Sequence, residues 1–179
     1  VIPYMKLKDM KTYAEDLSAA IQELMIENRW SYGEDLAIVI SNDAIHYGDE
    51  DWGSSDLAPF GVDEAGNERA KQKDLSLIQT TLAGTLSNQK IRTFNFVTVD
   101  QDDYLQYNWT WCGRYSVPFG LLVANKLNQK IHNESLIGTF IDYRSSLHNP
   151  HIEVKNIGMG HTAPASSRHW VAYLGMSYQ

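Results

Sequence analysis

The sequence is poor in cysteine and in basic side chains. It holds 1 cysteine, which excludes an internal disulfide framework and a zinc site of the CxxC type. That count is typical of a reducing, cytoplasmic compartment, or of a thiol retained for its chemistry. Lys and Arg total 15 against 22 Asp and Glu, which gives a formal net charge of -7. Because most nucleic-acid binders carry a basic surface, we expect no nucleic-acid partner.

Long apolar runs are also missing. No stretch approaches the roughly 18 consecutive apolar residues of a transmembrane helix, so we expect no membrane partner. The hydrophobic fraction of 43% and the aromatic fraction of 11% are values of a globular protein. A length of 179 residues suits one domain, and no boundary divides the chain, so we treat 1–179 as a single domain.

The chain begins with the apolar residues Val1 and Ile2 followed by Pro3, with no signal-peptide pattern. This start is typical of an extended piece just before a helix. Two explanations stay open: a processed or fragmented chain, or an ordinary first strand. Composition alone does not choose between them.

Apolar residues at spacings of three and four predict helices along the first two thirds of the chain. The clearest helix covers 9–29, with Asp9 as its N-cap. The other predicted helices cover 67–87, a short acidic-capped stretch at 100–109, and 115–128. The stretch 90–98 is either a strand or a helix end.

Strands are predicted from apolar runs and from alternation. The run LAIVIS at 36–41 is short and unbroken, as in a central strand that is covered on both faces. Two more strands are predicted at 135–143 and 169–178, and 151–160 is an edge strand or a loop. A helix before the run at 36–41 and a long loop at 42–66 after it favour an α/β fold.

One histidine directly follows the predicted central strand. His46 lies in the sequence SNDAIHYG, where a buried strand gives way to polar residues. Ligands of open α/β sheets bind beyond the carboxyl ends of strands, where an imidazole serves as a base or a metal ligand. The alternative is a histidine that only caps a loop by hydrogen bonding.

The single cysteine is the second candidate. Cys112 lies in WCGR, just before a predicted helix start and two residues from Arg114. A helix N-terminus and a nearby guanidinium both favour the thiolate, which is the reactive and metal-binding form. The alternative is an inert, buried cysteine. Position alone leaves both interpretations open.

The other histidines and the aromatic residues are weaker signals. No HxH or HExxH pattern fixes a metal site, so ligands would have to gather from several loops. Aromatic residues crowd 104–119 and either wall a pocket or pack in the core. The remaining histidines are His132, His148, His151, His161 and His169.

Four motifs occur in one order: VISNDAIHYG, WCGRYSVPFGLL, FIDYRSS and VAYLGMSY. Together they resemble the C-terminal half of the Memo family, protein B of the AmmeMemoRadiSam system. The resemblance covers nearly the whole chain. It implies a fold like that of the class III extradiol dioxygenases, an α/β sandwich with a central mixed sheet and a metal-type pocket at the strand ends.

The resemblance also implies site residues. His46 matches the histidine that serves as catalytic base in the dioxygenases, and Cys112 matches the position at which Memo proteins place a thiol. His46 and Cys112 are therefore the expected metal-binding residues, with non-haem iron or copper as the metal. The family's two further site histidines lie in its N-terminal half and have no match here, so we expect a C-terminal portion of a longer domain.

The resemblance implies a metal-dependent, dioxygenase-like oxidoreductase that takes a small molecule or a peptide. Partners by the same resemblance are the radical SAM and AMMECR-type proteins of that system. A non-catalytic peptide- or phosphopeptide-binding scaffold stays open as the alternative, with Arg114 or Arg144 meeting an anion. A hydrolase that uses the same pocket is a third possibility.

Overall fold

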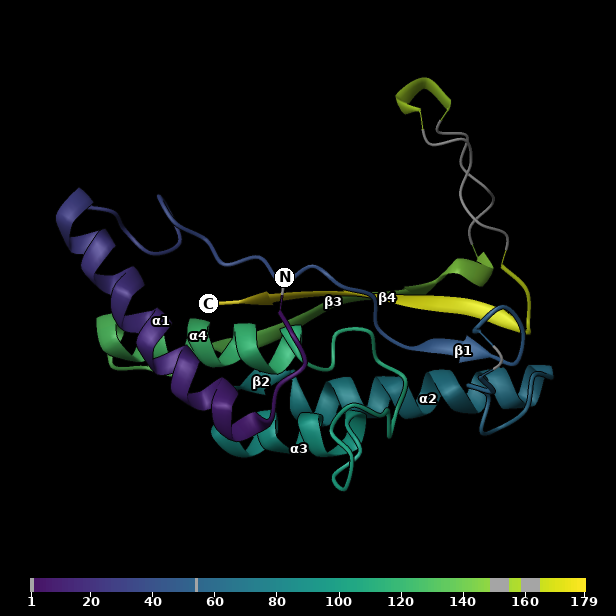
Figure 1. The fold of residues 1–179 in the computed structure, drawn as a ribbon. Coiled ribbons are helices and arrows are strands. Elements are labelled where there is room, and N and C mark those ends of the chain that lie inside the picture. The colour runs from purple at the N-terminus through teal and green to yellow at the C-terminus, as the bar shows by residue number, and fades with distance from the viewer. Residues whose placement is uncertain (1, 54, 149–154, 159–164) are drawn as a thin grey trace.

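The computed structural model describes residues 2–53, 55–148, 155–158 and 165–179. Helices and strands mix along the chain, which confirms the α/β class (Figure 1). The helices are α1 (Leu7–Asn28), α2 (Glu64–Thr81), α3 (Asn88–Thr98) and α4 (Ser116–His132). The strands are β1 (His46–Gly48), β2 (Gly84–Thr85), β3 (Ile137–Ser145) and β4 (His169–Tyr178). Two 3-10 turns, Ser146–His148 and Lys155–Ile157, complete the elements.

The strands form one sheet in the order β1-β4-β3-β2. Every pair of these strands is antiparallel, where a mixed sheet was expected. The long pair β3–β4 runs from Gly138 opposite Tyr178 to Ser145 opposite Ala172, with a bulge between Phe140 and Asp142. The short β1 continues the other edge of β4, with His46 opposite Val171.

Helices α2, α3 and α4 lie on the same side of the sheet (Figure 1). The core between these layers is aromatic, and its largest fully buried side chains include Trp109, Trp111, Trp170, Tyr47 and Phe94. On the other face of β3 and β4, Ile141 and Tyr173 are exposed. The sheet is therefore covered by helices on one face in the described part of the chain.

Helix periodicity predicted most of these helices. The helices expected at 9–29, 67–87 and 115–128 are confirmed as α1, α2 and α4, and 90–98 is helical within α3. Two details are wrong. The N-cap of α1 is Lys6, not Asp9, and 100–109 forms turns in which Asp100 accepts backbone hydrogen bonds. No helix of the described residues is long and apolar enough to cross a membrane.

The prediction of a buried central strand at 36–41 is wrong. This run is extended but belongs to no strand, and its burial alternates: Ile38 and Ile40 are half-buried, whereas Val39 is 84% exposed. Ile40 packs on Gly120 of α4, where any side chain at position 120 would collide with it. The run has the composition of a central strand without the neighbouring strands that such a position needs.

The remaining strand predictions are confirmed as β3 and β4. Most of the stretch 151–160 lies outside the described residues, as do His151 and His161, and its described part holds the 3-10 turn Lys155–Ile157.

Candidate functional site

The backbone between β4 and a second extended segment positions the candidate site. On one side, the Ala44 N–H donates to the Ala172 carbonyl and the Ala172 N–H donates to the Ile45 carbonyl, both at 2.9 Å. On the other side, the His46 N–H donates to the Thr110 carbonyl at 2.9 Å and the Cys112 N–H to the Ala44 carbonyl at 3.2 Å. The segment around Ile45 is thus held from both edges, which fixes the two candidate residues relative to each other.

Asp43, His46 and Cys112 gather at this place. One ligand atom from each lies within 4.8 Å of the others. His46 Nε2 is 3.3 Å from Asp43 Oδ2, and the two residues are three apart in sequence. Asp43 and His46 are half-buried, and the Cys112 side chain is exposed. In the described part of the chain, no other group of three potential ligands is found.

The donor set fits a transition-metal ion. A tetrahedral ion with bonds of 2.0–2.3 Å needs ligand atoms about 3.3–3.8 Å apart, so the cluster would contract by about 1 Å at its widest. Imidazole and thiolate suit copper, iron and zinc, whereas a carboxylate alone suits harder ions. Three ligands also leave a coordination position free, as catalytic sites do.

Two further rings extend from the His46 imidazole. Trp52 stacks on His46 with ring centroids 4.9 Å apart, and it also stacks on His169 at 4.1 Å and 16°. The His169 Nδ1 atom is 3.0 Å from the Glu50 carbonyl oxygen, which ties this ring to the loop that carries Trp52. The three-ring stack therefore restrains the plane of the His46 ring.

Ion pairs hold the same loop against the start of β4. The Arg168 guanidinium donates to both Asp49 oxygens at 2.8 and 2.6 Å and contacts Glu50 at 2.7 Å. Arg168 lowers the pKa of Asp49, chiefly through the side-chain hydrogen bond. Gly48 lies between these groups at φ 133, where a Cβ would come within 1.9 Å of the Arg168 carbonyl oxygen. A close backbone approach thus requires glycine at position 48.

A second carboxylate lies on the inner side of the same extended segment. Asp74 is fully buried and accepts hydrogen bonds from Trp109 Nε1 at 3.1 Å, from Trp111 Nε1 and from the Tyr143 hydroxyl at 2.9 Å. Burial raises the pKa of Asp74 to about 6, against the opposing effect of hydrogen bonds from these three side chains and from the Ile45 backbone. This carboxylate joins α2, the 109–111 segment and β3 inside the core.

The structure alters both reasons for expecting a reactive thiol at Cys112, namely the helix N-terminus and the nearby guanidinium. Helix α4 begins at Ser116, so Cys112 is four residues before it. The Arg114 guanidinium lies over the rings of Tyr107 at 3.6 Å and Tyr115 at 4.6 Å, and it donates to the Leu105 carbonyl. Of the aromatic residues at 104–119, Trp109, Trp111 and Tyr115 pack in the core, whereas Tyr107 is exposed and covers the buried Arg114.

The structure brings His46 and Cys112 together, and of the other described histidines His169 is linked to His46 through the Trp52 ring. His148 bonds the Ser145 hydroxyl at 2.9 Å, and His132 lies at the end of α4. Sequence reasoning missed Asp43 as a site residue. The signal was present: Asp43 is an acidic residue three positions before His46, in the polar stretch that follows the apolar run.

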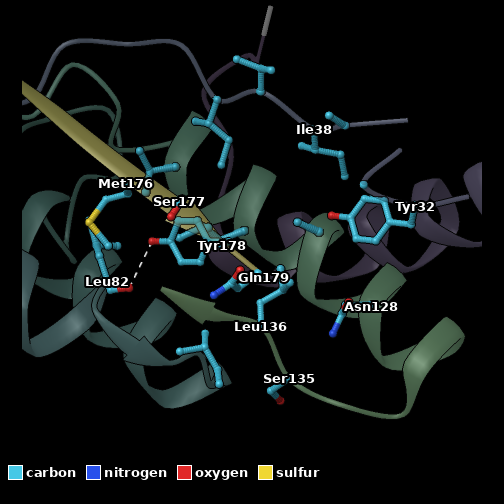
Figure 2. Close-up of a pocket in the computed structure, with 18 of the residues that line it drawn as sticks. Tyr32, Ile38, Leu82, Asn128, Ser135, Leu136, Met176, Ser177, Tyr178 and Gln179 are labelled. Atoms are coloured by element: carbon cyan, nitrogen blue, oxygen red, sulfur yellow. Dashed lines mark hydrogen bonds between the residues drawn. The ribbon is translucent and has the colours of Figure 1, made fainter. Parts of the chain in front are cut away.

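A cavity of the structure is separate from this cluster. It has a volume of about 760 Å³ and lies between the 37–42 segment, α4 and the end of β4 (Figure 2). Its lining includes Asn42 and Trp111, the sequence neighbours of Asp43 and Cys112, but none of the three cluster residues. The cavity and the cluster are therefore adjacent and distinct.

Comparison with protein-family models, with characterised proteins and with solved structures finds no match to this chain.

Proposed function

We propose that this chain carries a non-haem metal site formed by Cys112, His46 and Asp43, and that the site belongs to a metal-dependent oxidoreductase related to the class III extradiol dioxygenases. The observation that supports the proposal is the convergence of three unlike ligand atoms within 4.8 Å at one end of the sheet. The resemblance to the Memo family selects iron or copper, and the thiolate favours copper.

The fold relationship is part of the same proposal. A sheet that helices cover on one face, with Ile141 and Tyr173 exposed on the other, is compatible with a portion of a larger α/β sandwich. The partners that the resemblance implies, radical SAM and AMMECR-type proteins, remain predictions.

The chain's own residues have separable roles in this proposal. Cys112 supplies an exposed thiolate ligand, so a small molecule can approach the same place. Without a metal, Asp43 accepts a hydrogen bond from His46 and so orients its imidazole; a bound ion would take the place of that proton, with both residues as ligands. His46 then acts as ligand or as base toward a bound substrate. A bound iron or copper ion supplies the redox chemistry.

The alternative of a phosphopeptide-binding scaffold has less support. It relied on Arg114 or Arg144 to meet an anion. Arg114 is buried among tyrosine rings, and Arg144 donates to Asp142 Oδ2 at 2.8 Å. Neither guanidinium is presented to a ligand next to the cluster.

Metal titration of the purified chain tests the site. We expect one Cu(II) equivalent by calorimetry, with Cys112→Ser and His46→Gln each weakening binding at least tenfold. His132→Gln removes a histidine outside the cluster and should leave the affinity unchanged. Equal weakening in all three variants would show that binding is nonspecific.

Oxygen consumption with a catecholic substrate tests the reaction. The copper- or iron-loaded chain should consume oxygen faster than the metal-free chain, and Cys112→Ser should abolish the difference. If the chain binds metal but consumes no oxygen, the metal site is supported and the oxidoreductase assignment is contradicted.

A further inference from the structure

The apolar run at 36–41 offers backbone hydrogen-bonding groups that the described residues do not use. From Ala37 to Ser41, no backbone N–H or C=O bonds another backbone group of the described residues, although the segment is extended. The run continues directly into Ala44 and β1, which do pair with β4. An extended segment with free edges is a template for a further strand.

The facing edge of β4 is equally unpaired. Bonds between antiparallel strands alternate along each strand. Ile137 and Gln179 exchange both of their hydrogen bonds, and Ala172 bonds the Ala44–Ile45 side, so the even-numbered residues of β4 face away from β3. The N–H and C=O groups of Leu174, Met176 and Tyr178 therefore point toward the 37–42 segment and find no backbone partner among the described residues.

The 37–42 segment and the edge of β4 are joined at one end and move apart from there. The cavity of about 760 Å³ lies between them. The joined end lies at Ala44 and Ala172, where the backbones of the two segments are hydrogen-bonded to each other. Figure 2 shows Ile38 on one side of the space and Met176, Ser177 and Tyr178 on the other. Apolar side chains of α4 and of the chain before β3 also line the cavity: Val117, Leu121, Ala124 and Leu136.

We propose that this slot binds one extended strand of another polypeptide, which inserts between the 37–42 segment and β4. The strand bonds both edges, antiparallel to one and parallel to the other, because the two edges run in opposite directions. It spans about six residues, or about 20 Å. Alternate apolar side chains of the strand pack on the α4 side of the slot, as in binding by strand addition.

Charge indicates the chemistry of the partner. Glu34 and Asp35 precede the run, Asp43 follows it, and Glu134 lies on the cavity wall. No lysine or arginine of the described residues lines the cavity. The strand therefore carries basic residues at its ends. A second copy of this chain fits poorly, because its own run is flanked by the same acids and its net charge is also -7.

Labelled peptides test the slot in the full chain. The probe is acetyl-KKVTVTVKK-amide, and its first control replaces the central valine by proline, which cannot serve as a central strand. A second control replaces every lysine by glutamate. By fluorescence anisotropy we expect the probe to bind at least tenfold tighter than either control. Its binding should slow amide hydrogen exchange at residues 37–41 and at Leu174, Met176 and Tyr178.

A charge reversal gives a matched variant without touching the fold. Glu34→Lys with Glu134→Lys changes two exposed side chains and should weaken probe binding while strengthening binding of the glutamate control. Equal binding of the proline control, or exchange protection elsewhere, would overturn the proposal. So would a dimer in sedimentation whose protection maps to the same two edges, because the occupant would then be a second copy.

Discussion

Two carboxylates on opposite sides of the 109–112 segment show how this molecule separates stability from chemistry. Asp74 lies in the core and accepts from two indoles and a phenol. Asp43 lies at the half-exposed edge, and among the described residues the hydrogen-bond partner of its side chain is His46. A buried carboxylate with several donors ties elements together, whereas a carboxylate with few donors keeps lone pairs for a ligand.

The turns of the 109–112 segment make this separation possible. The chain bends at Trp109, where the Trp111 N–H donates to the Trp109 carbonyl at 2.7 Å, and it turns again at Cys112. Trp109 and Trp111 therefore reach inward to Asp74, whereas Cys112 is exposed beside His46. A segment of four residues thus serves both sites without sharing a side chain between them.

Replacing the buried carboxylate should have the largest effect. Asp74→Ala leaves two indole N–H groups and a hydroxyl without an acceptor in the core, so we expect a loss of at least about 3 kcal/mol in the free energy of unfolding. Urea denaturation measures it. Asp74→Asn keeps one acceptor oxygen and should lose clearly less. Equal losses in both variants would show that the hydrogen bonds contribute little.

The pH dependence of stability should distinguish the two carboxylates next. Burial raises the folded-state pKa of Asp74 to about 6, so between its unfolded value and about 6 the folded protein holds a proton that the unfolded chain releases. Stability from this group is present at low pH and is lost as pH rises through about 6, by about 2–3 kcal/mol. The difference between wild type and Asp74→Asn, followed from pH 4 to 8, isolates it. A flat difference would contradict the raised pKa.

Removing the ring that stacks on His46 should have a moderate effect that is confined to the outer site. Aromatic stacking contributes about 0.5–1.5 kcal/mol. Trp52→Ala should therefore weaken Cu(II) binding about tenfold at most, through a less restrained His46 ring. Trp52→Phe keeps a stacking surface and should retain most of the affinity. A loss of stability as large as that of Asp74→Ala would place Trp52 in the framework.

The smallest effect on stability is expected at Cys112. Its side chain is exposed, so Cys112→Ser should change the free energy of unfolding by less than about 0.5 kcal/mol. The neighbouring change Trp111→Phe removes a buried donor to Asp74 and should cost more. If Cys112→Ser lost more stability than Trp111→Phe, the distinction between the inner and outer faces of the segment would be wrong.

Local patterns predicted the helices because periodicity is encoded in consecutive residues. The sequence also predicted that His46 and Cys112 lie close together, but on premises that the structure does not bear out, because 36–41 is not a strand and α4 begins four residues after Cys112. Asp74 was not predicted, because its donors come from positions 35, 37 and 69 residues away. The run at 36–41 was wrongly predicted as a strand. Its hydrophobicity indicates that the segment can be buried, but strand formation also needs neighbouring strands to pair with, and hydrophobicity does not report these.

The turns at 109–112 also limit how this segment can change during evolution. A substitution alters one side chain, but an insertion or deletion of one residue would shift every later side chain by one position along these turns. The indole of Trp111 would then no longer meet Asp74, and the thiol of Cys112 would no longer lie beside His46. Natural variants and random libraries should therefore accumulate substitutions here and exclude single-residue length changes, whereas the turns at 100–107 tolerate both.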